Sequence, residues 1–144
     1  KLSATKTIVK NKSIILIDDS LVRGTTCHKI VKMLYESGAK EVHVRIACPE
    51  IKYPDFYGVD MPTKKELLAH KKTNKEMCDY INAKSLKFLS LNGLYRALVG
   101  DIRNSTYPQF SDHYFTGEYP IKPSDNLQGL QVKQLSLLSG KSNS

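Results

Sequence analysis

The sequence predicts an α/β fold in which helices flank a parallel sheet. Three observations near the start of the chain predict it. Residues 13–17 form a β-branched apolar run that ends at two acidic residues, as a buried central strand of a parallel sheet does. Apolar residues between 30 and 34 then recur at helical spacing, and residues 41–47 alternate apolar and polar side chains. A strand, a helix and a second strand in this order predict a parallel, right-handed βαβ unit.

The segments next along the chain carry local signals of their own. Ser37 and Gly38 provide a stop for the first helix, which is therefore expected to span about three turns. Proline and glycine recur between residues 49 and 62, and this density of helix breakers predicts an ordered loop. Residues 63–69 and 73–81 each open with a threonine followed three residues later by a glutamate, a capping-box pattern that predicts two short helices.

The last part of the chain has the pattern of a helical end followed by a polar tail. Residues 86–89 are expected to form another short strand, and apolar residues at near-helical spacing predict a helix over 90–99. From residue 121 onward aromatic residues are absent and serine, glutamine and lysine are common, so we expect a mobile, disordered tail. The predicted organisation is one folded unit at 1–120 and a tail at 121–144.

Size and composition are typical of one globular domain. The chain has 144 residues, of which 40% are hydrophobic and 25% charged. Its three cysteines have no CxxC spacing, which favours reduced, structural thiols over a zinc or dithiol centre. No apolar run approaches the roughly 18 residues that span a bilayer, and the lysine-rich start lacks the apolar core of a signal peptide. We therefore expect a cytoplasmic protein without a membrane partner.

The net charge of +8 is compatible with a nucleic acid, an anionic membrane surface or a phosphorylated substrate as the partner. Five lysines gather between residues 64 and 75, and no aromatic residue is interleaved with them. We interpret this cluster as a solvated helix face, so no nucleic-acid partner is predicted.

The strongest constellation follows the first strand. Two adjacent carboxylates can accept hydrogen bonds from the hydroxyls of a ribose or hold Mg²⁺. The loop after them enters a helix whose start offers free N–H groups, glycine and threonine hydroxyls to a phosphate. A strand end and a helix cap explain each residue alone, but ligand binding better explains all of them at the carboxyl edge of a parallel sheet. The predicted substrate-binding residues are Asp18, Asp19, Ser20, Leu21, Val22, Arg23, Gly24, Thr25 and Thr26, with Asp18 and Asp19 also as metal ligands.

Residues 14–26 resemble the signature by which type I phosphoribosyltransferases bind phosphoribosyl pyrophosphate (PRPP). The run Asp18-Asp19-Ser20-Leu21-Val22-Arg23-Gly24-Thr25-Thr26 is similar to the form of that signature in the amidophosphoribosyltransferase family. Three further stretches agree with this family, namely residues 1–4, residues 57–62 with 66–70, and residues 115–120. The resemblance covers residues 1–120 and implies a partial type I phosphoribosyltransferase fold.

The resemblance implies an activity and its requirements. Members of the family form 5-phosphoribosylamine from PRPP and glutamine in the first step of de novo purine biosynthesis, with Mg²⁺ on the pyrophosphate. A glutaminase domain supplies the ammonia, and the full-length proteins are expected to be homo-oligomers. Neither that domain nor the upstream half of the transferase domain is recognisable in this chain, so we expect the chain alone to be inactive or nearly so, and no catalytic residue is assigned.

Some members of the family hold an iron–sulfur cluster through cysteines, and the resemblance places two of those positions in this chain. Asp55 stands at the first, and residues 110–114, which cover the second, contain no cysteine. No iron–sulfur cluster is therefore expected.

Two other functions remain open from the sequence. The same loop is compatible with a truncated, non-catalytic remnant that binds PRPP or a nucleotide without turnover. A basic RNA-binding domain is supported only by the net charge and lacks a recognisable motif.

Overall fold

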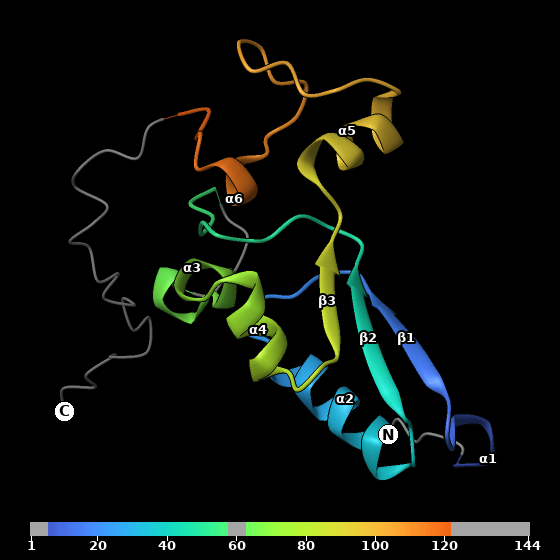
Figure 1. The fold of residues 1–144 in the computed structure, drawn as a ribbon. Coiled ribbons are helices and arrows are strands. Elements are labelled where there is room, and N and C mark those ends of the chain that lie inside the picture. Colours follow the sequence, from blue (N-terminus) through green and yellow to red (C-terminus); the bar gives the residue numbers. More distant parts are fainter. Residues whose placement is uncertain (1–5, 58–62, 122–144) are drawn as a thin grey trace, which may run out of the picture.

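The computed structural model describes residues 6–57 and 63–121, in which the chain forms one three-stranded parallel sheet with helices beside it (Figure 1). The strands, in sheet order, are β1 (Ser13–Asp18), β2 (Glu41–Ile46) and β3 (Ser85–Phe88). The helices are α1 (Lys6–Val9), α2 (Thr25–Glu36), the 3-10 helix η1 (Lys64–Glu66), α3 (Leu68–Lys71), α4 (Asn74–Tyr80), α5 (Leu91–Val99) and α6 (His113–Thr116). The predicted tail, from residue 122 on, and the stretches at 1–4 and 58–62 lie outside the described residues.

The parallel βαβ unit predicted from the sequence is confirmed. β1 and β2 pair in parallel, with Ile14 opposite Val42, and α2 connects them. α2 ends where the sequence indicates, because the N–H of Ser37 donates to the carbonyl of Met33 and Gly38 takes a φ of 94°. β3 pairs with β2 in the same direction. The carboxyl ends of all three strands therefore meet at one edge of the sheet.

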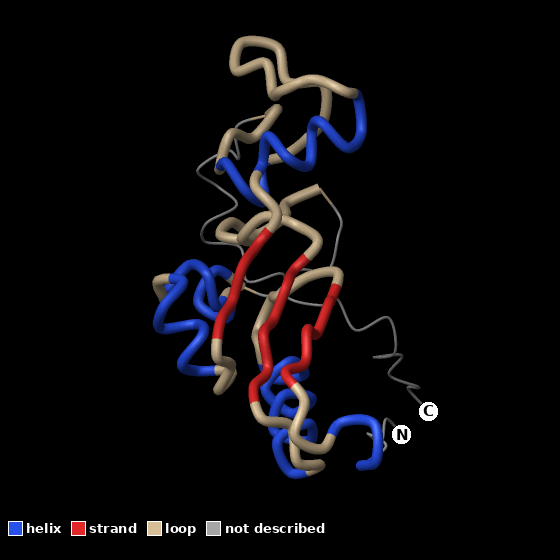
Figure 2. The backbone as a smooth tube through the Cα atoms, turned by 45° about the vertical axis from the view of Figure 1, so that its right-hand side comes forward, coloured by secondary structure: helices blue, strands red, loops and turns tan. Residues whose placement is uncertain are grey.

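The core lies on one face of this sheet, whose three strands run side by side in Figure 2. Alternate residues of β2 are buried, namely Val42, Val44 and Ile46, which confirms the alternation predicted for this strand. α2 packs against β2 and α4 packs against β3. Val31 of α2 and Met77 of α4 are completely buried in the resulting cluster.

The prediction that residues 13–17 form a buried central strand is wrong for the part of the chain that the structure describes. β1 is an edge strand in the order β1-β2-β3. Its side chains alternate: Ile14 and Leu16 pack on the core, whereas Ile15 and Ile17 are 65% and 73% exposed. An uninterrupted apolar run is typical of a strand covered on both faces, and the described residues cover only one face of β1.

The first of the two predicted capping-box helices is divided in two. Thr63 and Glu66 form the capping box, but the backbone becomes extended at Leu67, with φ −69° and ψ 117°, so η1 ends there and α3 begins separately. The division has a tertiary cause, because the N–H of Leu68 donates to the carbonyl of Val22 in the loop after β1, at 2.9 Å. The second capping box begins α4 as predicted.

Residues 89–121 form a smaller unit beyond the carboxyl edge of the sheet (Figure 1). β3 and α5 lie where the sequence predicts them, and Ser90 caps α5. The sequence does not predict α1 and α6, because helices of four residues show no apolar periodicity. The N–H groups of Lys52 and Tyr53, in the loop after β2, both donate to the carbonyl of Tyr114 and attach the unit to the sheet. Within the described ranges, no helix has the length and apolar character to cross a bilayer.

Candidate functional site

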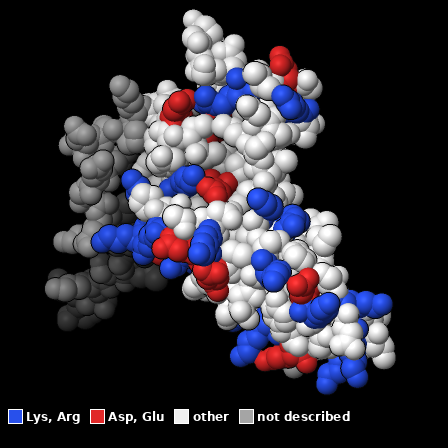
Figure 3. Space-filling view, in the orientation of Figure 1, with Lys and Arg blue, Asp and Glu red and all other residues white. Residues whose placement is uncertain are grey.

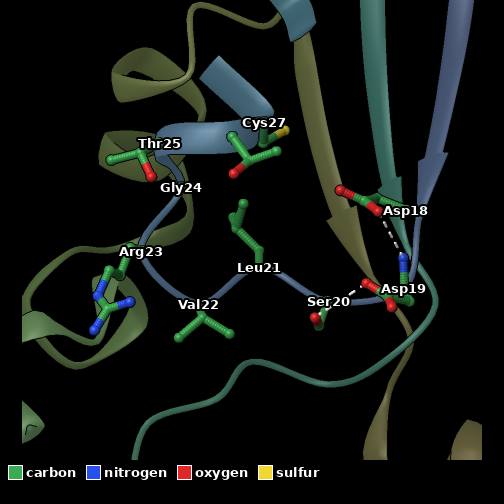
Figure 4. Close-up of a pocket in the computed structure, with 10 residues that line it drawn as sticks. Asp18, Asp19, Ser20, Leu21, Val22, Arg23, Gly24, Thr25 and Cys27 are labelled. Atoms are coloured by element: carbon green, nitrogen blue, oxygen red, sulfur yellow. Dashed lines mark hydrogen bonds between the residues drawn. The ribbon is translucent and has the colours of Figure 1, made fainter. Parts of the chain in front are cut away.

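All nine residues predicted to bind substrate come together at the carboxyl end of β1 (Figure 4). They line a hollow of about 320 Å³ that begins at the strand end, follows the loop and reaches the first turn of α2. Cys27, which the sequence does not mark as a site residue, completes the lining. The predicted set is therefore contiguous in space as well as in sequence.

Asp18 and Asp19 provide two carboxylates at the strand end. Asp18 Oδ1 accepts the N–H of Asp19 at 3.1 Å, and Asp19 Oδ1 accepts the hydroxyl of Ser20 at 3.1 Å. Across residues 6–57 and 63–121, no cluster of three or more His, Cys, Asp or Glu side chains could hold a metal ion. Mg²⁺ is nevertheless compatible with this pair, because it binds through one or two carboxylates and completes its shell with water and substrate phosphates.

The first turn of α2 has the features of an anion site. Gly24 precedes the helix in the left-handed region, with a φ of 76°, and provides no side-chain cap. The N–H of His28 donates to the carbonyl of Gly24 at 2.9 Å and is the first to have a partner within the helix. The N–H groups of Thr25, Thr26 and Cys27 therefore have no intrahelical acceptor and carry the positive end of the helix dipole.

Two buried side chains anchor the loop and the helix start. Leu21 and Cys27 are each 2% exposed and belong to the core. Burial, and secondly the negative charge of Asp18, raise the pKa of the Cys27 thiol to about 11. The thiol is therefore neutral at pH 7, and the structural role expected for this cysteine is confirmed.

The segment from η1 to α4 supports the loop from outside the hollow, and the sequence does not reveal this. Arg23 pairs with Glu66, with Nη2 3.1 Å from Oε1. A Cβ atom added to Gly24 would lie 2.8 Å from Cδ2 of Leu68 and 3.1 Å from Cε1 of Tyr80. These contacts join residues far apart in the chain, so no local sequence pattern predicts them. The capping box that includes Glu66 predicts only the start of η1.

Positive and negative side chains are interspersed over the face shown in Figure 3. Two lysines of the 64–75 cluster lie over aromatic rings of the same chain: Nζ of Lys64 is 5.9 Å from the ring centroid of Tyr53, and Nζ of Lys72 is 5.9 Å from that of Tyr80. Both ammonium groups therefore have an aromatic neighbour within the chain.

Replacing Gly24 with alanine is expected to destabilise the protein by about 1–3 kcal/mol and to weaken ligand binding at the loop. The new Cβ would be strained at a φ of 76° and would crowd Leu68 and Tyr80. Urea unfolding and ligand titration of Gly24→Ala measure the two effects.

Gly100→Ala is a matched control for this substitution. Gly100 ends α5 at a φ of 78°, and a Cβ there would meet no described atom within 4 Å. Both variants carry the strain of a left-handed alanine, so their difference isolates the crowding at the loop. Equal destabilisation in the two variants, with ligand binding intact, would show that the loop accommodates a side chain at position 24.

Known proteins resemble this chain in both sequence and fold. No family model matches the sequence. Amidophosphoribosyltransferase from Rhizobium etli is 51% identical over 140 residues, which are 96% of this chain and 28% of that protein. The enzyme of the same name from Staphylococcus aureus is 52% identical over 120 residues, which are 83% of this chain and 24% of that protein.

Two solved structures agree with these relatives. Glutamine PRPP amidotransferase from B. subtilis, in complex with ADP and GMP, has a TM-score of 0.76 and 41% identity, covering 85% of this chain and 27% of that one. A structure described as the allosteric regulatory enzyme of purine biosynthesis has a TM-score of 0.72 and 40% identity, covering 85% and 26%. The expected partial phosphoribosyltransferase fold is therefore confirmed.

The chain spans about a quarter of the length of the relatives that it matches. The identity extends over nearly the whole chain, and the matched region includes the loop after β1. In sequence and in fold, the chain therefore corresponds to one segment of the amidophosphoribosyltransferases to which it is similar.

Proposed function

We propose that the hollow binds PRPP together with Mg²⁺, and that the chain is the PRPP-binding part of an amidophosphoribosyltransferase. Such an enzyme forms 5-phosphoribosylamine from PRPP and glutamine at the start of purine biosynthesis. The observation that carries the proposal is that two carboxylates and an uncapped helix start line the same hollow. The same hollow therefore offers acceptors for a ribose diol and donors for a phosphate.

Each end of the hollow has a separate role in this proposal. The carboxylates of Asp18 and Asp19 accept the ribose hydroxyls and contribute to the Mg²⁺ shell, directly or through water. The N–H groups at the start of α2, with the hydroxyls of Thr25 and Thr26, bind the 5-phosphate. When bound, Mg²⁺ would neutralise charge on the departing pyrophosphate. In this arrangement the sugar lies between the carboxylates of Asp18 and Asp19 and the start of α2.

The proposal also covers the domain bounds, the nitrogen source, the location and the oligomeric state of the protein. Residues 1–120 belong to the transferase domain, and residues 121–144 are a separate tail. Glutamine provides ammonia through another part of the polypeptide, and the working protein is a cytoplasmic homo-oligomer. No iron–sulfur cluster takes part, because Asp55 stands where cluster-bearing relatives are expected to have a cysteine, and its Oδ1 is hydrogen-bonded to Nε2 of His113 at 2.8 Å.

Isothermal titration with PRPP tests the binding. We expect saturable heat with PRPP and Mg²⁺, weaker binding with EDTA present, and measurable binding of ribose 5-phosphate through the phosphate end alone. No heat at millimolar PRPP with a folded sample would refute the proposal. Binding without turnover by the complete polypeptide that carries this sequence, with either glutamine or ammonia as nitrogen donor, would instead favour the non-catalytic remnant.

A further inference from the structure

The two carboxylate oxygens of Glu66 contact different residues, Thr63 and Arg23. Oε2 accepts the N–H and the hydroxyl of Thr63, each at 3.0 Å, and so completes the capping box of η1. Oε1 accepts Nε of Arg23 at 3.2 Å and lies 3.1 Å from Nη2 of the same guanidinium. A helix cap needs only the first set of contacts. The second set connects η1 to the loop that lines the hollow.

The neighbours of Arg23 in the loop contact the same segment. The carbonyl of Val22 accepts the N–H of Leu68 at 2.9 Å. Gly24 lies against Leu68 and Tyr80 so closely that an added Cβ would approach both within 3.1 Å. Three consecutive loop residues are thus fixed from outside the hollow.

The Arg23 side chain points away from the two carboxylates. Figure 4 shows it on the side of the loop opposite Asp18 and Asp19, beyond Val22 and Gly24. Its cation is already compensated by Glu66, whose pKa is held below its usual range mainly by the hydrogen bonds from Thr63 and further by Arg23. A paired guanidinium contributes less to an incoming phosphate than a free one does.

We propose that Arg23, although it contributes to the lining of the hollow, is a positioning residue for the loop whose guanidinium is held by Glu66, and not a ligand of the substrate phosphate. This inference rests on the proposed function and deepens it, since it assigns the phosphate to the N–H groups of residues 25–27 and the hydroxyls of Thr25 and Thr26. The ion pair keeps the loop in the conformation that presents those donors.

The two roles of Arg23 predict opposite effects of Glu66→Gln on ribose 5-phosphate affinity. A positioning arginine loses its partner, and the affinity falls about two- to fivefold, the effect of an exposed ion pair. Arg23→Ala has the same effect, and the double variant binds no more weakly than either single variant because both remove one interaction. An arginine that binds phosphate would instead be released by Glu66→Gln, and the affinity would rise.

Glu76→Gln is the matched control, because Glu76 forms the same capping box with Thr73 and has no contact with Arg23 among the interactions of the described residues. Titrations with ribose 5-phosphate, and with PRPP and Mg²⁺, are made on the complete polypeptide that carries this sequence. We expect unchanged affinity in Glu76→Gln. Equal losses of affinity in Glu66→Gln and Glu76→Gln would show that Glu66 acts only as a helix cap and would overturn the inference.

Amide hydrogen exchange at residues 22–24 separates failure of this inference from failure of the proposed function. We expect faster exchange there in Glu66→Gln and Arg23→Ala than in the unmodified protein and in Glu76→Gln, with or without ligand. Tighter binding by Glu66→Gln, or a loss of tens-fold or more in Arg23→Ala alone, overturns the positioning role and leaves PRPP binding intact. If the unmodified protein binds neither ligand, the proposed function fails, and unchanged exchange in Glu66→Gln refutes the positioning role independently.

Discussion

Asp18→Asn combined with Asp19→Asn is expected to weaken PRPP binding by at least about a hundredfold. Each carboxylate is proposed to accept hydrogen bonds from the ribose diol and to share in the Mg²⁺ shell. Hydrogen bonds to a charged group contribute about 1.5–3 kcal/mol each, so losing two such acceptors is a large effect. Titration with PRPP and Mg²⁺ measures it directly.

A decrease in PRPP affinity in this double variant distinguishes lost contacts from the change in net charge. Removing two negative charges makes the surroundings of the hollow more positive, which by itself would favour an anion such as PRPP. A loss of affinity therefore has to come from lost contacts to the diol or the metal. The matched control is Glu36→Gln with Asp101→Asn, which removes two exposed carboxylates elsewhere and should leave the affinity nearly unchanged. Unchanged affinity in the Asp18, Asp19 double variant would place the ligand at another site.

The sequence predicts the elements whose signals are local. The apolar run of β1, the helical spacing of α2 and the two capping boxes each lie within about a dozen residues. β1, α2 and α4 form where expected, and the first capping box begins the shorter helix η1. The site is predictable for the same reason, because all nine of its predicted residues are consecutive. A strand end, a loop and a helix start must lie together once the strand and the helix exist.

The errors have non-local causes. β1 has the apolar character of a central strand, yet strand order depends on which segments pair with it, and its exposed Ile15 and Ile17 show that one face has no cover among the described residues. The break between η1 and α3 depends on a hydrogen bond from Leu68 to Val22, which no pattern within residues 63–69 encodes. The support of the loop by Glu66 is missed for the same reason.

A second feature that the sequence does not predict is the buried ion pair between Arg103 and Asp112 in the smaller unit. Their side chains are 10% and 5% exposed. Asp112 accepts the hydroxyl of Tyr95 at 2.7 Å and Nη2 of Arg103 at 3.2 Å, and Arg103 also contacts Glu118. Burial would raise the pKa of Asp112, but the hydrogen bonds from Arg103 and Tyr95 outweigh it and hold the pKa below its usual value.

Arg103→Ala is therefore expected to destabilise the protein by about 3–5 kcal/mol at pH 7, because it leaves the Asp112 carboxylate buried without its cation. Urea unfolding measures the loss. Arg96→Ala is the control: Arg96 is exposed on α5, so its removal should change the stability by no more than about 0.5 kcal/mol. Similar small changes in both variants would mean that the pair between Arg103 and Asp112 contributes little to the folded state.

The pH dependence of the Arg103→Ala effect tests its cause. In the unmodified protein the pKa of Asp112 is lowered on folding, so the stability from its ionised form is present above the unfolded pKa of about 4 and is lost as the pH falls through the folded pKa. In Arg103→Ala, burial without the cation should raise that pKa above about 4, so the carboxyl of the variant protonates first and its burial penalty is relieved. The difference in unfolding free energy between the two proteins should therefore narrow as the pH is lowered from 7 towards 3. A difference that stays constant over this range would attribute the loss to the packing of the Arg103 side chain rather than to the unpaired charge of Asp112.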